Sequence, residues 1–221
     1  MGKIINNQHV IVLHGMGRTW RSMWWLSRAL KQAGYIVHNT GYPSTHHHIQ
    51  WLADRYIKPV AKQLGKAERI HFVTHSLGGI LVRQYLQAHQ LPEGSRIVML
   101  APPNHGSEVA DKLRNWLPYQ WVNGPAGQQL GTDPDSIPNR LKPIPYESGI
   151  IAGDKSTNPL FSSWINGDDD GKVSVSSARL MEMKDFITVH CGHTMIMNNA
   201  HVIRQVIHFI EHGRFMHKKQ E

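Results

Sequence analysis

The sequence predicts a single α/β domain with a mostly parallel sheet, and three observations support this prediction. The chain has 221 residues, which suits one domain of ~100 to 250 residues and is too short for two large ones. Hydrophobic residues make up 40% and charged residues 18% of the chain, a balance that excludes intrinsic disorder over most of its length. Short apolar runs also alternate with stretches of helical period, as expected when helices cover a parallel sheet.

Six apolar runs have the length of strands, and four longer stretches have the spacing of helices. The expected strands are residues 9–13, 35–38, 70–74, 96–101, 149–153 and 186–190. The expected helices are residues 26–33, 49–64, 77–88 and 202–210, where apolar side chains recur at intervals of three and four. Gly34 follows the first helix as a stop signal, and Pro59 should kink or split the second. We therefore expect about six strands with helices on both faces of the sheet.

Residues 104–148 interrupt this alternation. They are rich in Gly and Pro, and a long stretch without regular structure is unusual inside a compact domain unless it is functional. The segment also contains the aromatic residues Trp116, Tyr119 and Trp121. We expect an irregular insert within the single domain formed by residues 1–221. Its aromatic side chains could cover a pocket as a small lid or fill a small satellite core, and both interpretations stay open.

The charge of the chain limits the classes of partner. The formal net charge is +8, but Lys and Arg are scattered, and only Arg214 to Lys219 form a short cluster. No basic stripe with interleaved aromatic residues is present, so we expect no binding to nucleic acid. Anionic substrates and lipid head groups remain compatible with this charge, as does binding to a membrane surface.

The sequence also predicts where the protein works. Apolar runs such as residues 10–13 are far shorter than the ~20 residues that cross a bilayer, so we expect no integral membrane segment. The polar stretch from Met1 to His9 lacks the apolar core of a secretory signal. The single cysteine, Cys191, excludes an internal disulfide. Together these features predict a cytoplasmic protein.

The strongest chemical signal is a serine between a strand and a helix. The predicted strand at residues 70–74 runs almost directly into Ser76, and Gly78 and Gly79 then open an amphipathic helix. This order is typical of a tight turn that holds a nucleophilic serine clear of the sheet, with small residues where the backbones approach closely. The turn also places the Leu77 amide at the positive end of the helix, where it can stabilise an oxyanion.

The motif Thr74-His75-Ser76-Leu77-Gly78 resembles the Gly-x-Ser-x-Gly motif of the α/β-hydrolase family, in its lipase and esterase branch. Thr74 replaces the first glycine. The stretch from Val10 to Gly17 is similar to the strand and His-Gly loop of that family. The resemblance runs from Val10 to about Phe215 and implies the α/β-hydrolase fold.

The resemblance also implies which groups surround the serine. The amides of Met16 and Leu77 would form the oxyanion hole, and His14, Gly15 and His75 would contact the substrate, although for the His14 side chain we favour a structural role in the loop. Ala101 to Ser107, with Asp111, is similar to a segment of bacterial lipases that implies a role for His105 in the wall of the cleft. Arg18 and Trp20 follow the oxyanion loop and could contact substrate or brace the loop.

A serine nucleophile needs a base, and the base needs an acid that fixes its tautomer. Asp170 lies in Gly167 to Val173, which resembles the Asp-Gly-x-Val pattern of lipases, and the resemblance favours it as the acid. Asp154 is the main alternative because it follows the predicted strand at 149–153, and Asp168 and Asp169 are further alternatives. For the base, His193 fits the Gly-His position of the family, and His190 is the alternative.

The acidic run also has part of the register of a calcium-binding loop. Asn166, Asp168 and Asp170 match its first three ligand positions and Gly171 its turn glycine, but Asn166 replaces the usual Asp and Ser177 stands where the bidentate Glu belongs. We therefore expect no metal and no cofactor.

The resemblance implies a serine hydrolase that cleaves carboxylic esters through an acyl-enzyme. Its substrate would be a small acyl ester or a lipid. A thioesterase, an amidase or another acyl hydrolase could use the same three residues, and a catalytically silent member of the family could act as a binding module. These alternatives stay open at the level of sequence.

Overall fold

The computed structural model describes residues 7–156 and 158–217. The start of the polar N-terminal stretch and the end of the basic C-terminal cluster therefore lie outside the described residues. Within them, one sheet of six strands has the order β2-β1-β3-β4-β5-β6, and each neighbouring pair is parallel. The strands are β1 Gln8–Leu13, β2 Ile36–Thr40, β3 Arg69–His75, β4 Arg96–Leu100, β5 Glu147–Gly153 and β6 Asp185–Val189. The predicted fold class is confirmed.

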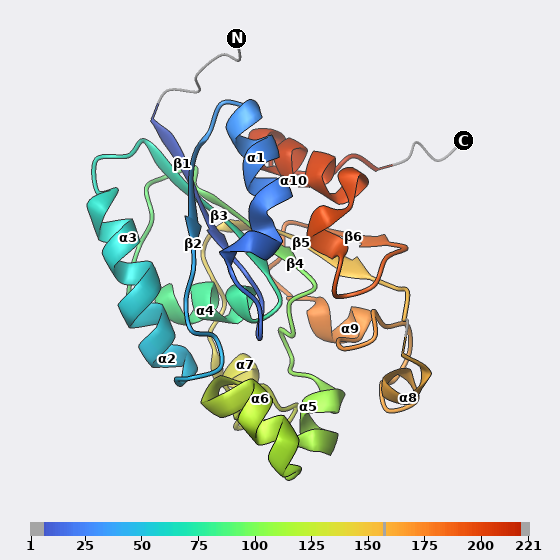
Figure 1. The fold of residues 1–221 in the computed structure, drawn as a ribbon. Helices are drawn as coiled ribbons and strands as arrows, with labels where there is room; N and C mark the ends of the chain where they lie inside the picture. Colours follow the sequence, from blue (N-terminus) through green and yellow to red (C-terminus); the bar gives the residue numbers. More distant parts are fainter. Residues whose placement is uncertain (1–6, 157, 218–221) are drawn as a thin grey trace.

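Helices cover both faces of this sheet (Figure 1). On one face, α1 (Trp24–Gln32) and α10 (Ala200–His212) cover a core that includes Val10, Val12 and Val73. On the other face, α2 (Ile49–Leu52), α3 (Lys58–Gln63) and α4 (Leu77–Tyr85) cover a core that includes Ile11 and Phe72. Neighbouring residues of a strand point to opposite faces, so one strand supplies both cores. The sheet is consequently buried between two layers of helices.

The remaining regular elements are short. They are η1 Trp20–Met23, η2 Ala53–Ile57, α5 Glu108–Leu113, α6 Leu117–Gln128, α7 Ile137–Arg140, α8 Pro159–Ser162, α9 Val175–Ala178 and η3 Ile196–Asn198. The π-helical turn η2 directly precedes α3, which contains Pro59. Proline lacks an amide hydrogen and its ring crowds the carbonyl four residues earlier, so a widened turn at this point is physically reasonable. None of the helices in the described part of the chain has the length and apolar character needed to cross a membrane.

Residues 104–148 contain three helices, α5 to α7, so the expectation of an irregular insert was wrong in this respect. Helical periodicity is hard to detect here because α6 is kinked at Gly124, which has a φ of 58°, and Pro125 follows directly. Pro118 occupies the first turn of α6, where proline is tolerated. Figure 1 shows the three helices gathered beyond the end of the sheet at which the parallel strands finish.

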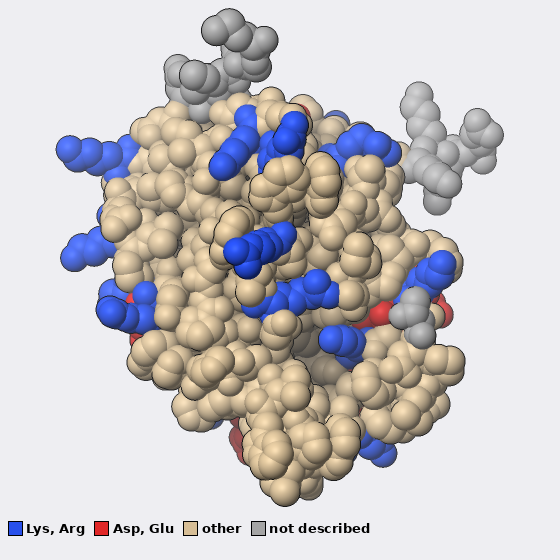
Figure 2. All heavy atoms as spheres, in the orientation of Figure 1, with Lys and Arg blue, Asp and Glu red and all other residues tan. Residues whose placement is uncertain are grey.

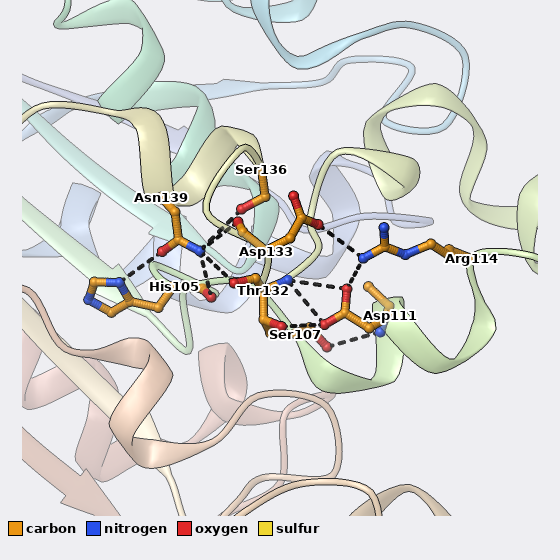
Figure 3. Close-up of polar contacts among 9 residues, drawn as sticks. His105, Ser107, Asp111, Arg114, Thr132, Asp133, Ser136 and Asn139 are labelled. Atoms are coloured by element: carbon orange, nitrogen blue, oxygen red, sulfur yellow. Dashed lines mark hydrogen bonds and ion pairs between the residues drawn. The ribbon is translucent and has the colours of Figure 1, made fainter.

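A polar network joins the parts of this insert (Figure 3). The Asp111 carboxylate on α5 accepts hydrogen bonds from the amide and the hydroxyl of Thr132 and pairs with Arg114. The Arg114 guanidinium also lies 3.0 Å from Asp133. The Asn139 side-chain amide donates to the carbonyls of Thr132 and Asp133 at 2.9 and 3.1 Å. These contacts link α5 and α7 through the loop between α6 and α7.

Candidate active site

Ser76 occupies a strained turn between β3 and α4. Its φ of 52° and ψ of −121° lie outside the usual regions for a residue with a side chain, and such a conformation costs about 1 to 3 kcal/mol. The Ser76 amide donates to the Leu100 carbonyl at 2.8 Å, and the Ser76 carbonyl accepts from Gly79 at 2.9 Å. A Cβ at Gly78 would lie only 3.0 Å from the Leu13 carbonyl oxygen. The close approach of α4 to β1 therefore requires glycine at position 78.

An imidazole lies within hydrogen-bond distance of this serine. His193 lies in the loop after β6, and its Nε2 is 3.0 Å from Ser76 Oγ. Its Nδ1 is 2.7 Å from Asp170 Oδ2, and both side chains are buried. If Nδ1 carries the proton and donates to the carboxylate, Nε2 is free to accept from the serine hydroxyl. The structure thus brings Ser76, His193 and Asp170 into one hydrogen-bonded chain.

Backbone groups fix the orientation of the Asp170 carboxylate. Its Oδ1 accepts from the Lys172 amide at 3.0 Å and from the Val173 amide at 2.9 Å. The Asp170 carbonyl accepts from the His193 amide at 3.0 Å. With Oδ1 engaged by the two amides, Oδ2 is directed at His193.

The alternative acid and the alternative base lie together, apart from Ser76. His190 Nδ1 is 3.0 Å from Asp154 Oδ1, and the His190 side chain is 74% exposed. Asp168 is exposed, whereas the buried Asp169 accepts from the Gly171 amide at 2.6 Å and from the Ser162 hydroxyl. The structure shows no contact of these four residues with Ser76. Among the described residues, no group of three or more Asp, Glu, His or Cys side chains is arranged so that it could hold a metal ion.

The loop after β1 packs directly against the serine turn. A Cβ at Gly15 would lie 2.6 Å from His75 Nδ1 and 3.2 Å from the Ser76 Cβ. The next residue, Met16, has its side chain in the same pocket as Ser76. Leu77 is the first residue of α4, where a helix amide has no acceptor inside the helix. The position of both residues suits the predicted pair of oxyanion donors, whose role stays a prediction.

Ser76 and His193 face a pocket with a volume of about 420 Å³. Much of its apolar wall comes from the insert, including Val109, Leu113, Trp116, Tyr119 and Val122. Two of the three aromatic residues noted in the sequence therefore contact the pocket, whereas Trp121 is 79% exposed and does not line it. Phe161 and Val173 line the pocket from the segments after β5.

Of the four predicted substrate contacts His14, Gly15, His75 and His105, the structure brings only His75 to the pocket lining. His14 is buried beneath the loop, where its Nδ1 is 2.8 Å from the Gly15 carbonyl and its ring stacks on Tyr42. His105 is exposed and lies 3.1 Å from Asn139 Oδ1 (Figure 3). His14, Gly15 and His105 are not among the lining residues. In His14 and His105, a neighbouring polar group holds the ring away from the pocket.

His75 forms a second contact to the base. Its Nε2 lies 3.0 Å from the His193 carbonyl, so it can donate there and steady the loop. Burial is the main cause that lowers the pKa of His75 well below its usual value, and the charges of His193, Arg18 and Lys172 add to this effect. His75 is therefore a neutral imidazole.

Two basic residues complete the pocket lining, Arg18 and Lys172. Arg18 stands in the sequence next to the oxyanion loop, but Lys172 was missed as a pocket residue. The sequence feature that could have identified Lys172 as a pocket residue is its position two residues after Asp170. The pKa of Lys172 is lowered, first because the pocket walls remove water from the ammonium and then because Arg18 repels it. Lys172 nevertheless retains considerable contact with solvent.

Comparison with known proteins agrees with this arrangement. Residues 10–188 match the sequence model of the alpha/beta hydrolase family. The chain belongs to this family. The resemblance inferred from the sequence motifs is thereby confirmed, although no curated protein matches the sequence.

Several solved structures of α/β hydrolases have a similar fold. The mature lipase BlEst2 of Bacillus licheniformis is similar with a TM-score of 0.69 and 21% identity, over 89% of each chain. Phospholipase PlaB from Legionella pneumophila gives a TM-score of 0.64 and 20% identity, over 78% of this chain and 45% of that one. The metagenomic carboxyl esterase MGS0156 gives a TM-score of 0.65 and 17% identity, over 89% of this chain and 67% of that one. At these identities the likeness shows the fold alone.

Proposed function

We propose that the protein is a serine hydrolase that cleaves carboxylic esters through an acyl-enzyme. The observation that carries this proposal is the hydrogen-bonded chain from Ser76 through His193 to Asp170, with distances of 3.0 and 2.7 Å. A serine hydroxyl is a weak nucleophile at neutral pH, and an imidazole held in the correct tautomer activates it. The family membership supports the same chemistry.

The chemistry proceeds in two halves. His193 Nε2 takes the proton of Ser76 as its Oγ attacks the ester carbonyl carbon, and Asp170 stabilises the resulting imidazolium. The amides of Met16 and Leu77 donate to the oxyanion. The intermediate then expels the alcohol, which receives the proton from His193, and leaves the acyl group on Ser76. Water repeats the attack with His193 as base, which releases the acid and restores the serine.

The pocket indicates the class of ester. Its apolar wall of Leu113, Trp116 and Val122 suits an acyl chain, and the names of the similar structures include a lipase, a phospholipase and a carboxyl esterase. We infer an acyl ester or lipid substrate. We also infer that residues 104–148 belong to the single domain and act as its substrate-covering lid. The cytoplasmic location stays a prediction of the sequence.

An activity-based fluorophosphonate probe tests the nucleophile. We expect the probe to label the wild type at Ser76 and a panel of nitrophenyl esters from acetate to palmitate to be hydrolysed. Ser76→Ala should abolish both signals, whereas the matched control Ser163→Ala, at an exposed position, should keep them. A folded wild type that stays unlabelled and hydrolyses no ester would favour the silent binding module. Turnover of thioesters or amides alone would move the assignment to those acyl hydrolases.

A further inference from the structure

Two positive charges line the candidate pocket, and neither forms an ion pair within the described part of the chain, although the Asp170 charge partly offsets the fall in the pKa of Lys172. Arg18 comes from the loop after β1, and Lys172 comes from the turn that carries Asp170. Across residues 7–156 and 158–217, neither side chain takes part in an ion pair with an acidic side chain. Asp170 is the nearest candidate in sequence, but its oxygens are used by His193 and two backbone amides. The pair is therefore available to a ligand.

The charges of the two cations reach other groups of the pocket. The Arg18 charge lowers the pKa of Lys172, and both charges lower the pKa of His75. Both cations line the same pocket as His75, the residue that precedes Ser76. Two like charges in a concave site repel each other, and an anion between them would relieve the repulsion.

Basic side chains also lie beside the pocket at the surface. In Figure 2, several Lys and Arg side chains lie on the upper side of the hollow on the displayed face, and uncharged residues form its lower rim. Aromatic and aliphatic side chains of the insert, such as Trp116 and Val122, line the same pocket. The site thus combines an apolar wall with a cationic one, a combination suited to a molecule that has both an apolar chain and an anionic group.

We propose that Arg18 and Lys172 bind an anionic group, a carboxylate or a phosphate, that is part of the ester substrate. This inference rests on the proposed function, because it names the substrate class of the same site. Arg18 can contact the anion through two donors and Lys172 through its ammonium. Bound there, the anion would hold the ester carbonyl beside Ser76.

Matched ester pairs test this selectivity. The first pair is para-nitrophenyl hexanoate and mono-para-nitrophenyl adipate, which differ by a carboxylate on the acyl side. The second is a monoacylglycerol and the monoacylglycerol phosphate with the same chain, which differ by a phosphate on the alcohol side. We expect the wild type to favour the anionic member of at least one pair in kcat/KM, and the favoured pair identifies the source of the charge.

Substitution of the cations should remove this preference. Lys172→Met and Arg18→Met should each lower the anionic-to-neutral ratio of kcat/KM by about tenfold, the effect of one charge-assisted hydrogen bond. Lys172→Arg should retain the ratio, and so should the control Lys31→Met, an exposed lysine outside this pocket. An equal loss of kcat/KM on neutral and anionic esters would show that the cations stabilise the oxyanion of every substrate. Such a loss, or a wild type without any anionic preference, would overturn the proposal.

Binding without turnover separates this inference from the proposed function. Calorimetry with Ser76→Ala should give at least about tenfold tighter binding of octyl phosphate or octanoate than of octanol, and adding Lys172→Met should reduce the difference. Equal affinity for the three probes would overturn the anion site whatever the esters show. Selective binding by a wild type that hydrolyses no ester would leave the anion site intact and overturn only the proposed hydrolase activity.

Discussion

At the scale of single residues, the candidate acids and bases form two acid–imidazole pairs with different surroundings. Asp170 and His193 are buried and contact Ser76, whereas Asp154 and His190 form a pair that is open to solvent. Only the first pair can hold the tautomer of the imidazole that contacts the serine. The second pair has an ordinary surface environment, and exposed pairs of this kind contribute little to stability.

Replacing each acid with its amide distinguishes the two pairs. We expect Asp170→Asn to lower kcat by about 10⁴-fold, the size of loss typical when the orienting carboxylate of such a triad becomes an amide. Asp154→Asn should change kcat by less than about twofold, because its partner His190 has no contact with Ser76. Steady-state kinetics on one nitrophenyl ester measures the kcat of both variants, and circular dichroism verifies that they are folded. The reverse ranking would assign the acid to Asp154.

At the scale of elements, the insert forms the pocket wall and depends on its own polar network (Figure 3). Helix α5 supplies Val109, Ala110 and Leu113 to the pocket. Asp111 on the same helix joins it to Thr132, in the loop that follows α6. One carboxylate that contacts no part of the candidate catalytic chain therefore helps to hold this apolar wall in place.

Asp111→Ala should loosen this wall without disturbing the serine turn. Removing the carboxylate leaves the Thr132 amide and the Arg114 guanidinium without this acceptor, which costs about 1 to 3 kcal/mol locally. We expect a severalfold higher KM for long-chain esters, little change with acetate, and faster limited proteolysis within residues 114–136. Asp135→Ala, an exposed acid in the same insert, is the control. An unchanged KM and cleavage pattern would show that packing alone holds α5.

A comparison of the elements with their predictions shows which features can be read from the sequence. Strands such as β1 and β4 were predicted to within one residue because their apolar runs are local signals. The serine turn followed from a strand, a serine and two glycines in direct succession. Helix α6 was missed because Gly124 and Pro125 interrupt its period, and α5 and α7, with 6 and 4 residues, are too short to show one. The pocket position of Lys172 depends on how the turn after Asp170 folds, and side-chain direction in a turn has no periodic signal.

At the scale of the whole molecule, buried histidines link stability to pH. His14, His71 and His75 are buried, and burial is the main cause that lowers the pKa of each. For His71 the pKa falls to about 3. The unfolded chain takes up a proton near pH ~6.5, whereas the folded chain keeps these rings neutral. Stability is therefore retained at neutral pH and is lost as the pH falls below ~6.5, and for His71 the loss is about 1.4 kcal/mol per pH unit down to its folded pKa.

His71 offers the clearest test because its ring has a defined neutral role. Its Nδ1 accepts from the Arg96 amide at 3.0 Å, and its Nε2 lies 3.4 Å from Gln8 Oε1. Protonation would remove the acceptor and place a charge beside Arg96 and Arg69, which already disfavour it. His71→Gln is expected to lower stability at neutral pH but to reduce the loss between about pH 7 and about pH 5 by about 2 kcal/mol. Urea unfolding at both pH values measures this difference, and His48→Gln, at an exposed site, should leave it unchanged. If His71→Gln loses as much stability as the wild type over this interval, His71 takes up its proton in the folded protein as readily as in the unfolded chain.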